Sequence, residues 1–419
     1  MEELKPSEKK TLHDLKLKLE ESIKSNHLFF LHPISQPQKR SPISKPRIAS
    51  CSSSNKPTST SQTSKISLWG IPLLPSASND CLDTILLKFL RAREFRLCET
   101  FEMIQRTLRW RKEYGIDGIL KEDLDSEYYV GTAYMDGFDR EGHPVCYNVY
   151  GSLREDGMYE KVFGSREKQE RFLRWRVQFM ERGIQEFVSF KLGEVSAMVQ
   201  VIDLRDLLGS SVKELRGTVE KMIRIFQDNY PEFIFKNIFL NASLRCYTYR
   251  ALLSPLLSHR TESKFAFARP SKVTETLLRY IDPQNIPIQY GGFKRQNDAE
   301  FLAEDETVSE TFVKGGSITL IEIPIFYGGV TAVWDMVVVG WEVVYREEFI
   351  PEDEGSYKIL IKVEKKLRKP ARNSFYIHEP GKLVFTIENK TSDKKSIFYR
   401  YKFKPTIPCY TSIGRHPIR

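Results

Sequence analysis

Side chains able to do chemistry are sparse in the middle of this chain. Of seven histidines, only His143 and His259 fall in the region of alternating strands and helices described below. His143 lies in Asp-Arg-Glu-Gly-His-Pro, which is typical of a turn before a strand and favours a polar turn residue over a general base. Asp203 and Asp206 follow an apolar run and suggest a metal site, but two carboxylates without a third ligand make weak evidence for one. We predict structural roles for both.

The common catalytic templates do not occur in the sequence. We find no GxSxG elbow, HExxH, Walker loop or strand-linked GxGxxG. The six cysteines lack CxxC spacing, which argues against zinc and against a disulfide framework and favours reduced cytosolic thiols. We therefore predict that the protein is not an enzyme and uses no cofactor or metal.

The net charge of +9 favours an anionic partner such as membrane headgroups, nucleic acid or acidic proteins. Basic residues interleave with aromatic ones at 171–176 and 399–404, as in some nucleic-acid-binding faces. However, Phe172, Leu173 and Trp175 fit a buried helix stripe with the basic residues on its solvated side. We predict no nucleic-acid partner.

Two segments precede the folded region. Leucines and Ile23 amid charges in residues 9–26 predict a short amphipathic helix. Residues 27–66 hold ten serines, six Lys or Arg and no Asp or Glu, which predicts a disordered basic tail. The first residues lack the apolar core of a signal peptide, and no uncharged stretch approaches the ~20 apolar residues that cross a bilayer. We expect any membrane contact to be peripheral.

The elements expected after residue 66 fall into three groups. Residues 83–95 and 98–114 have apolar residues at helical spacing, with Lys88, Arg91 and Arg93 placed off the apolar face of the first helix. From 144 to 281, strands and helices alternate, which predicts an α/β layer with a largely parallel sheet. Beyond about 316 the helical period vanishes, and strands predicted at 318–325, 334–345, 357–363, 382–388 and 396–403 indicate a separate β-sandwich.

Residues 226–292 contain an apolar strand-like run and an apolar helix-like run, with polar groups at the turn positions. That composition suits an internal cavity for a ligand with a hydrocarbon tail and a charged head. Two acyl chains would bury on the order of 30 methylenes, each worth ~0.8 kcal/mol, so the lipid must lie inside, behind a movable wall. The candidate wall is a helix at 246–257, although an ordinary packing helix fits its periodicity equally well.

Several motifs then resemble a known family. Leu-Leu-Lys-Phe-Leu-Arg-Ala-Arg from residue 86 resembles the opening helices of CRAL-TRIO lipid-binding proteins, and Asp-Asn-Tyr-Pro-Glu and Pro-Ile-Gln-Tyr-Gly-Gly match motifs of that domain in order. The region from Trp334 is similar to a GOLD domain, and the combination is similar to the patellins of plants. The resemblance implies a phosphatidylinositol or phosphoinositide headgroup site made by Arg93, Thr261, Lys264 and Glu232. It does not imply phosphatidylcholine binding, because the positions at which the family holds a choline headgroup with small hydroxyls carry Met198 and Gln200 here.

The predicted architecture is therefore multidomain: an α/β CRAL-TRIO domain with an N-terminal helical subdomain, followed by an all-β GOLD sandwich. The predicted boundaries are a mostly disordered tail at 1–66, a helical subdomain at 67–130, the lipid-binding domain at 131–295, a linker at 296–315 and the sandwich at 316–408.

The resemblance implies a non-enzymatic, cytoplasmic and peripheral membrane protein that binds or transfers phosphoinositides during trafficking and cell-plate formation. Its expected partners are phospholipid, an anionic membrane surface and proteins that bind the GOLD domain. The alternative is a membrane-associated adaptor whose lipid pocket is vestigial, which the departure from the family at Ser-Leu-Arg-Cys, residues 243–246, favours.

Overall fold

The computed structural model describes eleven stretches of the chain: 4–25, 27–29, 66–74, 80–124, 128–129, 131–149, 151, 157–205, 212–243, 263–302 and 308–406. They form two compact units. The first is drawn from 1–130, 153–198 and 208–235, and the second from 131–152, 199–207 and 236–419.

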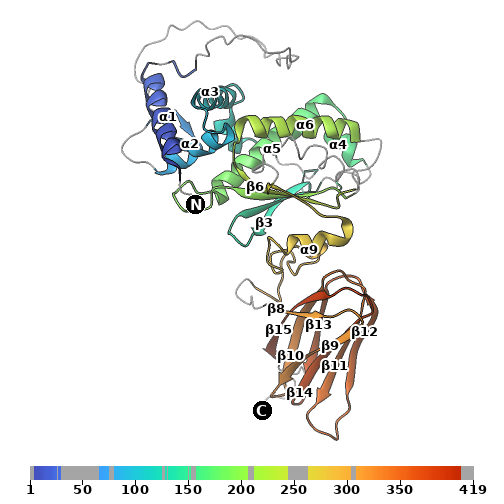
Figure 1. Ribbon diagram of the computed structural model, residues 1–419. Helices are drawn as coiled ribbons and strands as arrows, with labels where there is room; N and C mark the ends of the chain where they lie inside the picture. The colour runs from blue at the N-terminus through green and yellow to red at the C-terminus, as the bar shows by residue number, and fades with distance from the viewer. Residues whose placement is uncertain are drawn as a thin grey trace, which may run out of the picture. The chain divides into compact units, whose positions relative to one another are not determined.

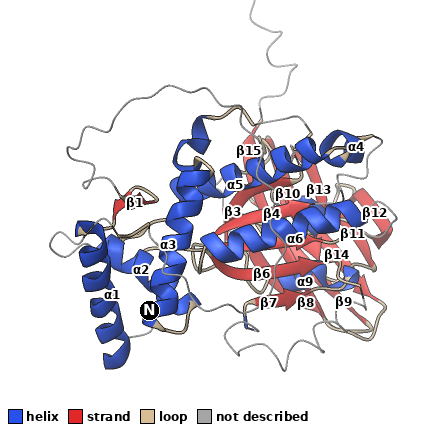
Figure 2. Cartoon of the chain, turned by 90° about the horizontal axis from the view of Figure 1, so that it is seen from above, coloured by secondary structure: helices blue, strands red, loops and turns tan. Residues whose placement is uncertain are grey.

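The first unit consists of helices and one short hairpin. Its helices α1, α2 and α3 pack against one another, and α5 packs against α6 (Figures 1 and 2). In order, its elements are α1 (Pro6–Lys24), β1 (Ser67–Leu68), β2 (Ile71–Pro72), α2 (Asp80–Ala92), α3 (Leu97–Glu113), the 3-10 helix η1 (Ile116–Lys121), α4 (Met158–Phe163), α5 (Arg166–Phe187) and α6 (Val212–Asn229).

Helix α1 follows the predicted amphipathic pattern. Pro6 occupies its first turn, where the missing N–H costs nothing, and the Glu8 carboxylate accepts a hydrogen bond from the Lys5 N–H at 2.9 Å. Spacings of three and four residues place four apolar side chains on one buried face: Leu12, Leu15, Leu19 and Ile23. Leu17 points away and is 52% exposed. The apolar face of α1 thus accounts for its packing on α2 and α3.

The second unit begins with a mixed five-stranded sheet. Its strands are β3 (Ala133–Phe138), β4 (Pro144–Val149), β5 (Met198–Asp203), β6 (Ile234–Leu240) and β7 (Phe265–Phe267), and they lie side by side in that order. β3 pairs antiparallel with β4, whereas β4–β5 and β6–β7 are parallel. The predicted α/β layer is therefore confirmed, with one antiparallel edge strand. After β7 come three short helices: η4 (Pro270–Lys272), α9 (Val273–Leu277) and η5 (Ile288–Tyr290).

The predicted β-sandwich is also confirmed. Two antiparallel four-stranded sheets, in the orders β13-β10-β15-β8 and β12-β11-β14-β9, enclose a core that includes Trp334 and Phe385 (Figure 1). Residues alternate strictly along β9, where Ile321, Ile323 and Ile325 are buried. The strands are β8 (Ser309–Val313), β9 (Ser317–Ile325), β10 (Val330–Val338), β11 (Val343–Pro351), β12 (Ile359–Leu367), β13 (Ala371–Ile377), β14 (Gly381–Asn389) and β15 (Lys395–Pro405).

Several details differ from the sequence-based expectation, and β3 and β13 lie where no strand was expected. The single strand expected at 334–345 is two strands, because Gly340, Trp341 and Glu342 adopt positive φ values of 84°, 51° and 61° and form a tight turn. Neither Trp nor Glu signals such a turn by its residue type. In addition, β8 lies within the stretch 296–315 that was expected to be a linker.

Candidate functional site

The structure places His143 in a turn and Asp203 at the end of β5. The Nδ1 of His143 lies 3.0 Å from Asp139 Oδ2, and the His143 N–H donates to Asp139 Oδ1 at 2.7 Å, so the pair closes the turn before β4. Asp203 Oδ1 accepts from the Arg205 N–H at 2.9 Å and from Asn241 Nδ2 at 2.6 Å. His259 and Asp206 lie outside the described residues. Within the described ranges, no three His, Cys, Asp or Glu side chains gather to hold a metal ion.

One face of the mixed sheet is covered by its own unit. On this face the Tyr147 ring stacks on Tyr290 with centroids 5.7 Å apart, and the Tyr290 hydroxyl donates to Asp203. The Lys236 ammonium lies 5.0 Å from the centroid of the Tyr280 ring. Tyr147, together with Ile238 on β6, is fully buried. The segment that contains α9 and η5 therefore seals this face.

The opposite face carries half-buried aromatic rings at the sheet edge. Parallel register pairs Asn237 with Phe265 and Phe239 with Phe267, so these side chains share one face. The Phe239 ring lies 4.9 Å from Phe267 and 6.1 Å from Phe265, nearly parallel to both. Unlike the neighbouring Ile238, all three rings are only half-buried. This face therefore presents hydrocarbon surface that the sheet itself does not cover, which is what an apolar ligand requires.

The basic residue Lys264 lies directly before this aromatic edge. Its carbonyl accepts from the Asn237 N–H at 2.7 Å, which fixes the start of β7, and its side chain is half-buried. Thr261, the other residue assigned to this part of the headgroup site, lies outside the described residues. The same is true of the candidate gate helix at 246–257.

The remaining two residues of the predicted headgroup site, Arg93 and Glu232, belong to the first unit. Arg93 follows the end of α2, and its guanidinium donates to the adjacent Ala92 carbonyl at 3.1 Å. Glu232 has a positive φ of 55° in the turn before β6, a conformation that is uncommon for a residue with a side chain. The common role of Arg93 and Glu232 in a headgroup site stays a prediction.

Sequence reasoning missed Lys88, which was placed off the apolar face of its helix. Lys88 is only 3% exposed, and its ammonium donates to the Ser196 carbonyl at 2.6 Å and to the Glu232 carbonyl at 2.9 Å. The same ammonium lies 4.5 Å from the centroid of the Phe233 ring. Lys88 thus holds the strained Glu232 turn against the opening helix. The lysine inside the otherwise apolar Leu-Leu-Lys-Phe-Leu run was the available signal.

A second buried polar group joins the β1–β2 hairpin to the first unit. Arg111 donates to both oxygens of Glu181, at 2.7 and 3.1 Å, and the Tyr230 hydroxyl and Trp69 Nε1 donate to Glu181 Oε1 at 2.6 and 3.3 Å. Burial opposes the charge on Arg111, but Glu181 and neighbouring groups hold its pKa above the usual range. The Trp69 ring also packs on Phe233, with centroids 4.7 Å apart. The hairpin is therefore an integral part of this unit.

Comparison with known proteins decides the family. Three family models match: CRAL/TRIO, N-terminal domain, over residues 34–106; CRAL/TRIO domain over 128–292; and Patellin-1-like, C-terminal GOLD domain, over 314–395. Patellin-6 of Arabidopsis thaliana is 42% identical over 82% of this chain and 83% of its own length. The chain belongs to the patellin family. Patellin-4 of the same plant is 49% identical over 81% of this chain, although the match spans only 62% of Patellin-4.

A more distant relative shares only part of this patellin. It is an Arabidopsis thaliana protein named "Phosphatidylinositol/phosphatidylcholine transfer protein SFH9", 32% identical over 54% of this chain and 39% of its own length. Among the helices that the structure describes, none is long and apolar enough to cross a membrane.

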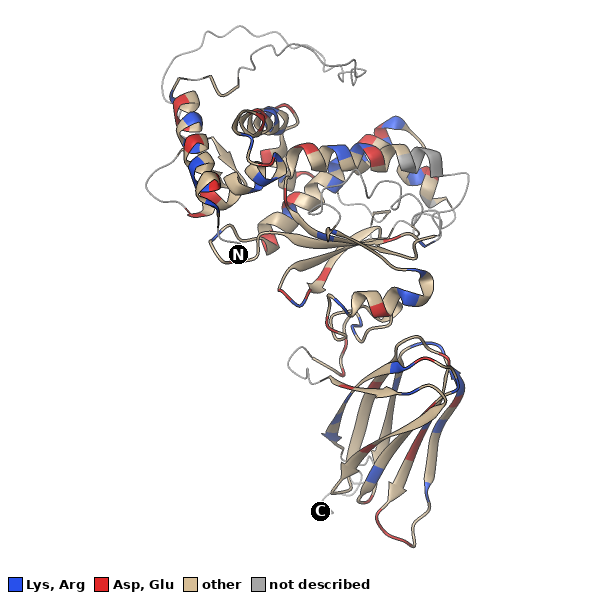
Figure 3. Ribbon diagram, viewed as in Figure 1, with Lys and Arg blue, Asp and Glu red and all other residues tan. Residues whose placement is uncertain are grey.

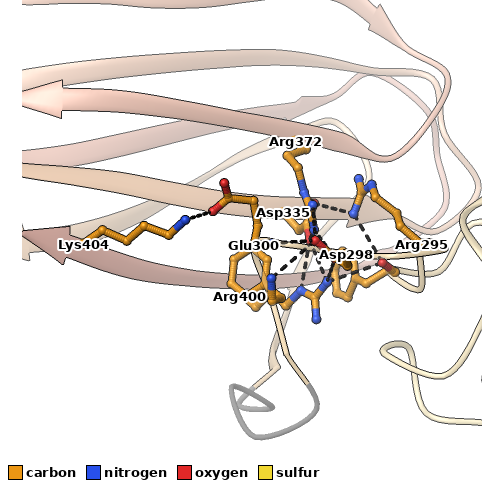
Figure 4. A network of polar contacts seen from close by, with 9 residues as sticks. Arg295, Asp298, Glu300, Asp335, Arg372, Arg400 and Lys404 are labelled. Atoms are coloured by element: carbon orange, nitrogen blue, oxygen red, sulfur yellow. Dashed lines mark hydrogen bonds and ion pairs between the residues drawn. The ribbon is translucent and has the colours of Figure 1, made fainter. Parts of the chain in front are cut away.

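In this patellin, the segment after the CRAL/TRIO match is bound to the GOLD sandwich by an ion-pair network (Figure 4). Arg372 bridges Asp298 of the segment, at 2.6 Å, and Asp335 of β10, also at 2.6 Å. Arg295 and Arg400 reach the fully buried Asp335 at 2.9 Å each. The guanidinium of Arg400 lies 4.2 Å from the centroid of the Phe301 ring. The first part of the expected linker is therefore packed onto the sandwich.

Proposed function

We propose that this patellin is a cytoplasmic, peripheral membrane protein that binds phosphatidylinositol or a phosphoinositide and transfers it without catalysis. The observation that carries the proposal is the face of the mixed sheet on which the rings of Phe239, Phe265 and Phe267 are half-buried. Lys264 directly precedes Phe265 at this edge of the sheet. Acyl chains would lie against the rings, and the Lys264 ammonium would neutralise a phosphate. The name of the SFH9 relative, a phosphatidylinositol/phosphatidylcholine transfer protein, supports the same lipid class.

The finer assignment follows the family resemblance. Phosphoinositide binding would place the protein in membrane trafficking, at the plasma membrane or at the cell plate that forms during cytokinesis. Arg93, Thr261, Lys264 and Glu232 remain the proposed headgroup residues, and phospholipid and an anionic membrane surface the proposed partners. We also propose that other proteins bind the GOLD sandwich.

The test is to extract lipid from the purified full-length chain and to identify it by mass spectrometry. We expect about one phospholipid per chain, enriched in phosphatidylinositol. Replacing both Phe239 and Phe267 by serine should strongly reduce the bound lipid, because the site loses most of its hydrocarbon contacts. The matched control is Phe312→Ser on β8, a ring that is 45% exposed in the sandwich.

A second candidate function is an adaptor whose lipid site is vestigial and whose GOLD sandwich recruits partners. The departure from the family at residues 243–246 favours it. Two results together would reject the carrier and favour the adaptor. The purified protein would reproducibly contain no lipid, and it would not change the rate of phosphatidylinositol transfer between vesicles.

A further inference from the structure

One end of the GOLD sandwich carries the most exposed aromatic side chains of the described chain. Tyr357 is 91% exposed, Phe326 79% and Tyr327 65%. Phe326 and Tyr327 belong to the turn between β9 and β10, and Tyr357 to the turn between β11 and β12. Rings this exposed contribute nothing to the core, so their position requires another explanation.

The two turns lie together because both contact a third, residues 378–380 between β13 and β14. The Glu352 N–H donates to the Pro380 carbonyl at 3.0 Å, and Ser356 Oγ donates to Glu379 Oε2 at 2.9 Å. On the other side, Gly328 lies directly against the His378 carbonyl, and the Gly329 N–H donates at 2.8 Å to the carbonyl of Ile377, the last residue of β13. We call the surface of turns 326–329, 352–358 and 378–380 the aromatic tip.

The aromatic tip is also acidic. It contains the four acids Glu352, Asp353, Glu354 and Glu379 and one base, Lys358, which gives a net charge of −3. The β11–β12 turn is red at its end in Figure 3. The neighbouring Lys382 does not offset this charge, because its ammonium binds Glu322 at 2.8 Å. An anionic membrane would be repelled by this tip, and so would the same tip of a second copy.

We propose that the aromatic tip is the docking site for an extended, arginine-rich segment of a partner protein. A guanidinium stacks on an exposed aromatic ring and at the same time donates two hydrogen bonds to a carboxylate. The turn at 352–358 holds both kinds of group, and the rings at 326–327 lie at the same end of the sheet, on the far side of β14. The hydrogen bonds from Glu352 and Ser356 to the 378–380 turn, and from Gly329 to β13, hold these groups in place before binding, which lowers the entropic cost. This site is separate from the lipid face and independent of the function proposed for it.

The test uses the full-length chain and a fluorescein-labelled peptide of five Arg-Gly-Ser repeats, followed by fluorescence anisotropy. We expect saturable binding that weakens with added salt. Tyr357→Leu should weaken binding about three- to tenfold, whereas Tyr357→Phe, which keeps the ring, should retain it. The triple change Glu352→Gln, Asp353→Asn and Glu354→Gln should weaken it at least as much. Glu310→Gln and Phe312→Leu, two exposed residues of β8, are the matched controls.

Three outcomes would overturn the proposal. The first is a peptide affinity that the tip variants do not change. The second is binding of phosphatidylserine-containing vesicles that the Tyr357→Leu change abolishes, because the tip would then dock on a membrane. The third is a tenfold rise in peptide affinity when Lys39, Arg40, Lys45 and Arg47 are replaced by serine, because the protein's own basic segment would then be the occupant.

Discussion

The hydroxyl of Tyr290 donates a hydrogen bond to the Asp203 carboxylate at 3.1 Å. The two residues come from two motifs of the sequence, Pro-Ile-Gln-Tyr-Gly-Gly and Val-Ile-Asp-Leu-Arg, which are 87 residues apart. Burial and the Asp203 charge hold the pKa of Tyr290 well above its usual range, so the hydroxyl keeps its proton and acts as a donor at every working pH. The contact fixes η5 on the covered face of the mixed sheet.

Tyr290→Phe should lower the free energy of unfolding by about 1–2 kcal/mol, because Asp203 loses one of its donors while staying buried. Urea denaturation measures the change. Tyr327→Phe is the control, since that side chain is 65% exposed and its hydroxyl should contribute nothing. Equal midpoints for the two variants would show that the hydrogen bond does not stabilise the fold.

Lys88→Met should destabilise the first unit by about 1–3 kcal/mol, because the carbonyls of Ser196 and Glu232 lose their donor. The loss should appear as faster hydrogen exchange in α2 and in the residues around Glu232. The exposed Lys9 of α1 provides the comparison, and Lys9→Met should exchange like the wild type. If both variants exchange at wild-type rates, Lys88 does not hold the turn.

Charge reversal at the lipid face tests the proposed headgroup site. The double change Lys264→Glu and Thr261→Asp should reduce binding to phosphoinositide-containing vesicles about tenfold or more, because a carboxylate then faces the phosphate. Far-UV circular dichroism should stay unchanged. The control is Lys314→Glu, which makes the same lysine-to-glutamate charge reversal at an exposed position of the sandwich. Vesicle binding that both variants retain would contradict the assignment.

The ion-pair network of the sandwich predicts a dependence on pH. Burial alone would raise the pKa of Asp298, but the hydrogen bonds from Arg372 and from the Glu300 and Phe301 N–H groups hold it well below its ordinary value of 3.8. A folded-state pKa below the unfolded one gives stability that is present above about pH 4 and is lost as the pH falls further.

Asp298→Asn should therefore cost about 3 kcal/mol at pH 7, and the difference from the wild type should shrink at pH 3. Hydrogen exchange of the β10 and β15 amides measures both values. Asp353→Asn, in an exposed turn, serves as the control and should show no loss at either pH. A difference that stays constant between pH 7 and pH 3 would mean that the Asp298 charge is not responsible.

Much of the fold could be predicted because it depends on local patterns. The period of α1 and the alternation along β9 follow from side chains that face the core at a regular interval. Lys88 could not be predicted in this way, because its partners lie 108 and 144 residues away in the sequence. The turn at 339–342 was missed for a different reason: Trp341 and Glu342 adopt a backbone conformation that their residue types disfavour.

In the candidate site, too, some features follow from local sequence patterns and others do not. The aromatic rings at 239, 265 and 267 were predicted only as apolar strand residues, and their shared face became visible through the β6–β7 register. The headgroup residues came from the family motif, because nothing in the local pattern distinguishes Lys264 from an ordinary solvated lysine at a strand start.

The position of Phe293 has a practical consequence for protein engineering. Its ring is fully buried against Val337 and Phe398 of the sandwich, although it lies 21 residues before the GOLD match begins at 314. A fragment cut at residue 314 would expose that apolar surface, and Arg372 and Arg400 would lose Asp298 and keep only Asp335 as a partner. Any excised or transplanted sandwich therefore has to carry the residues from 293 onward as its own first segment.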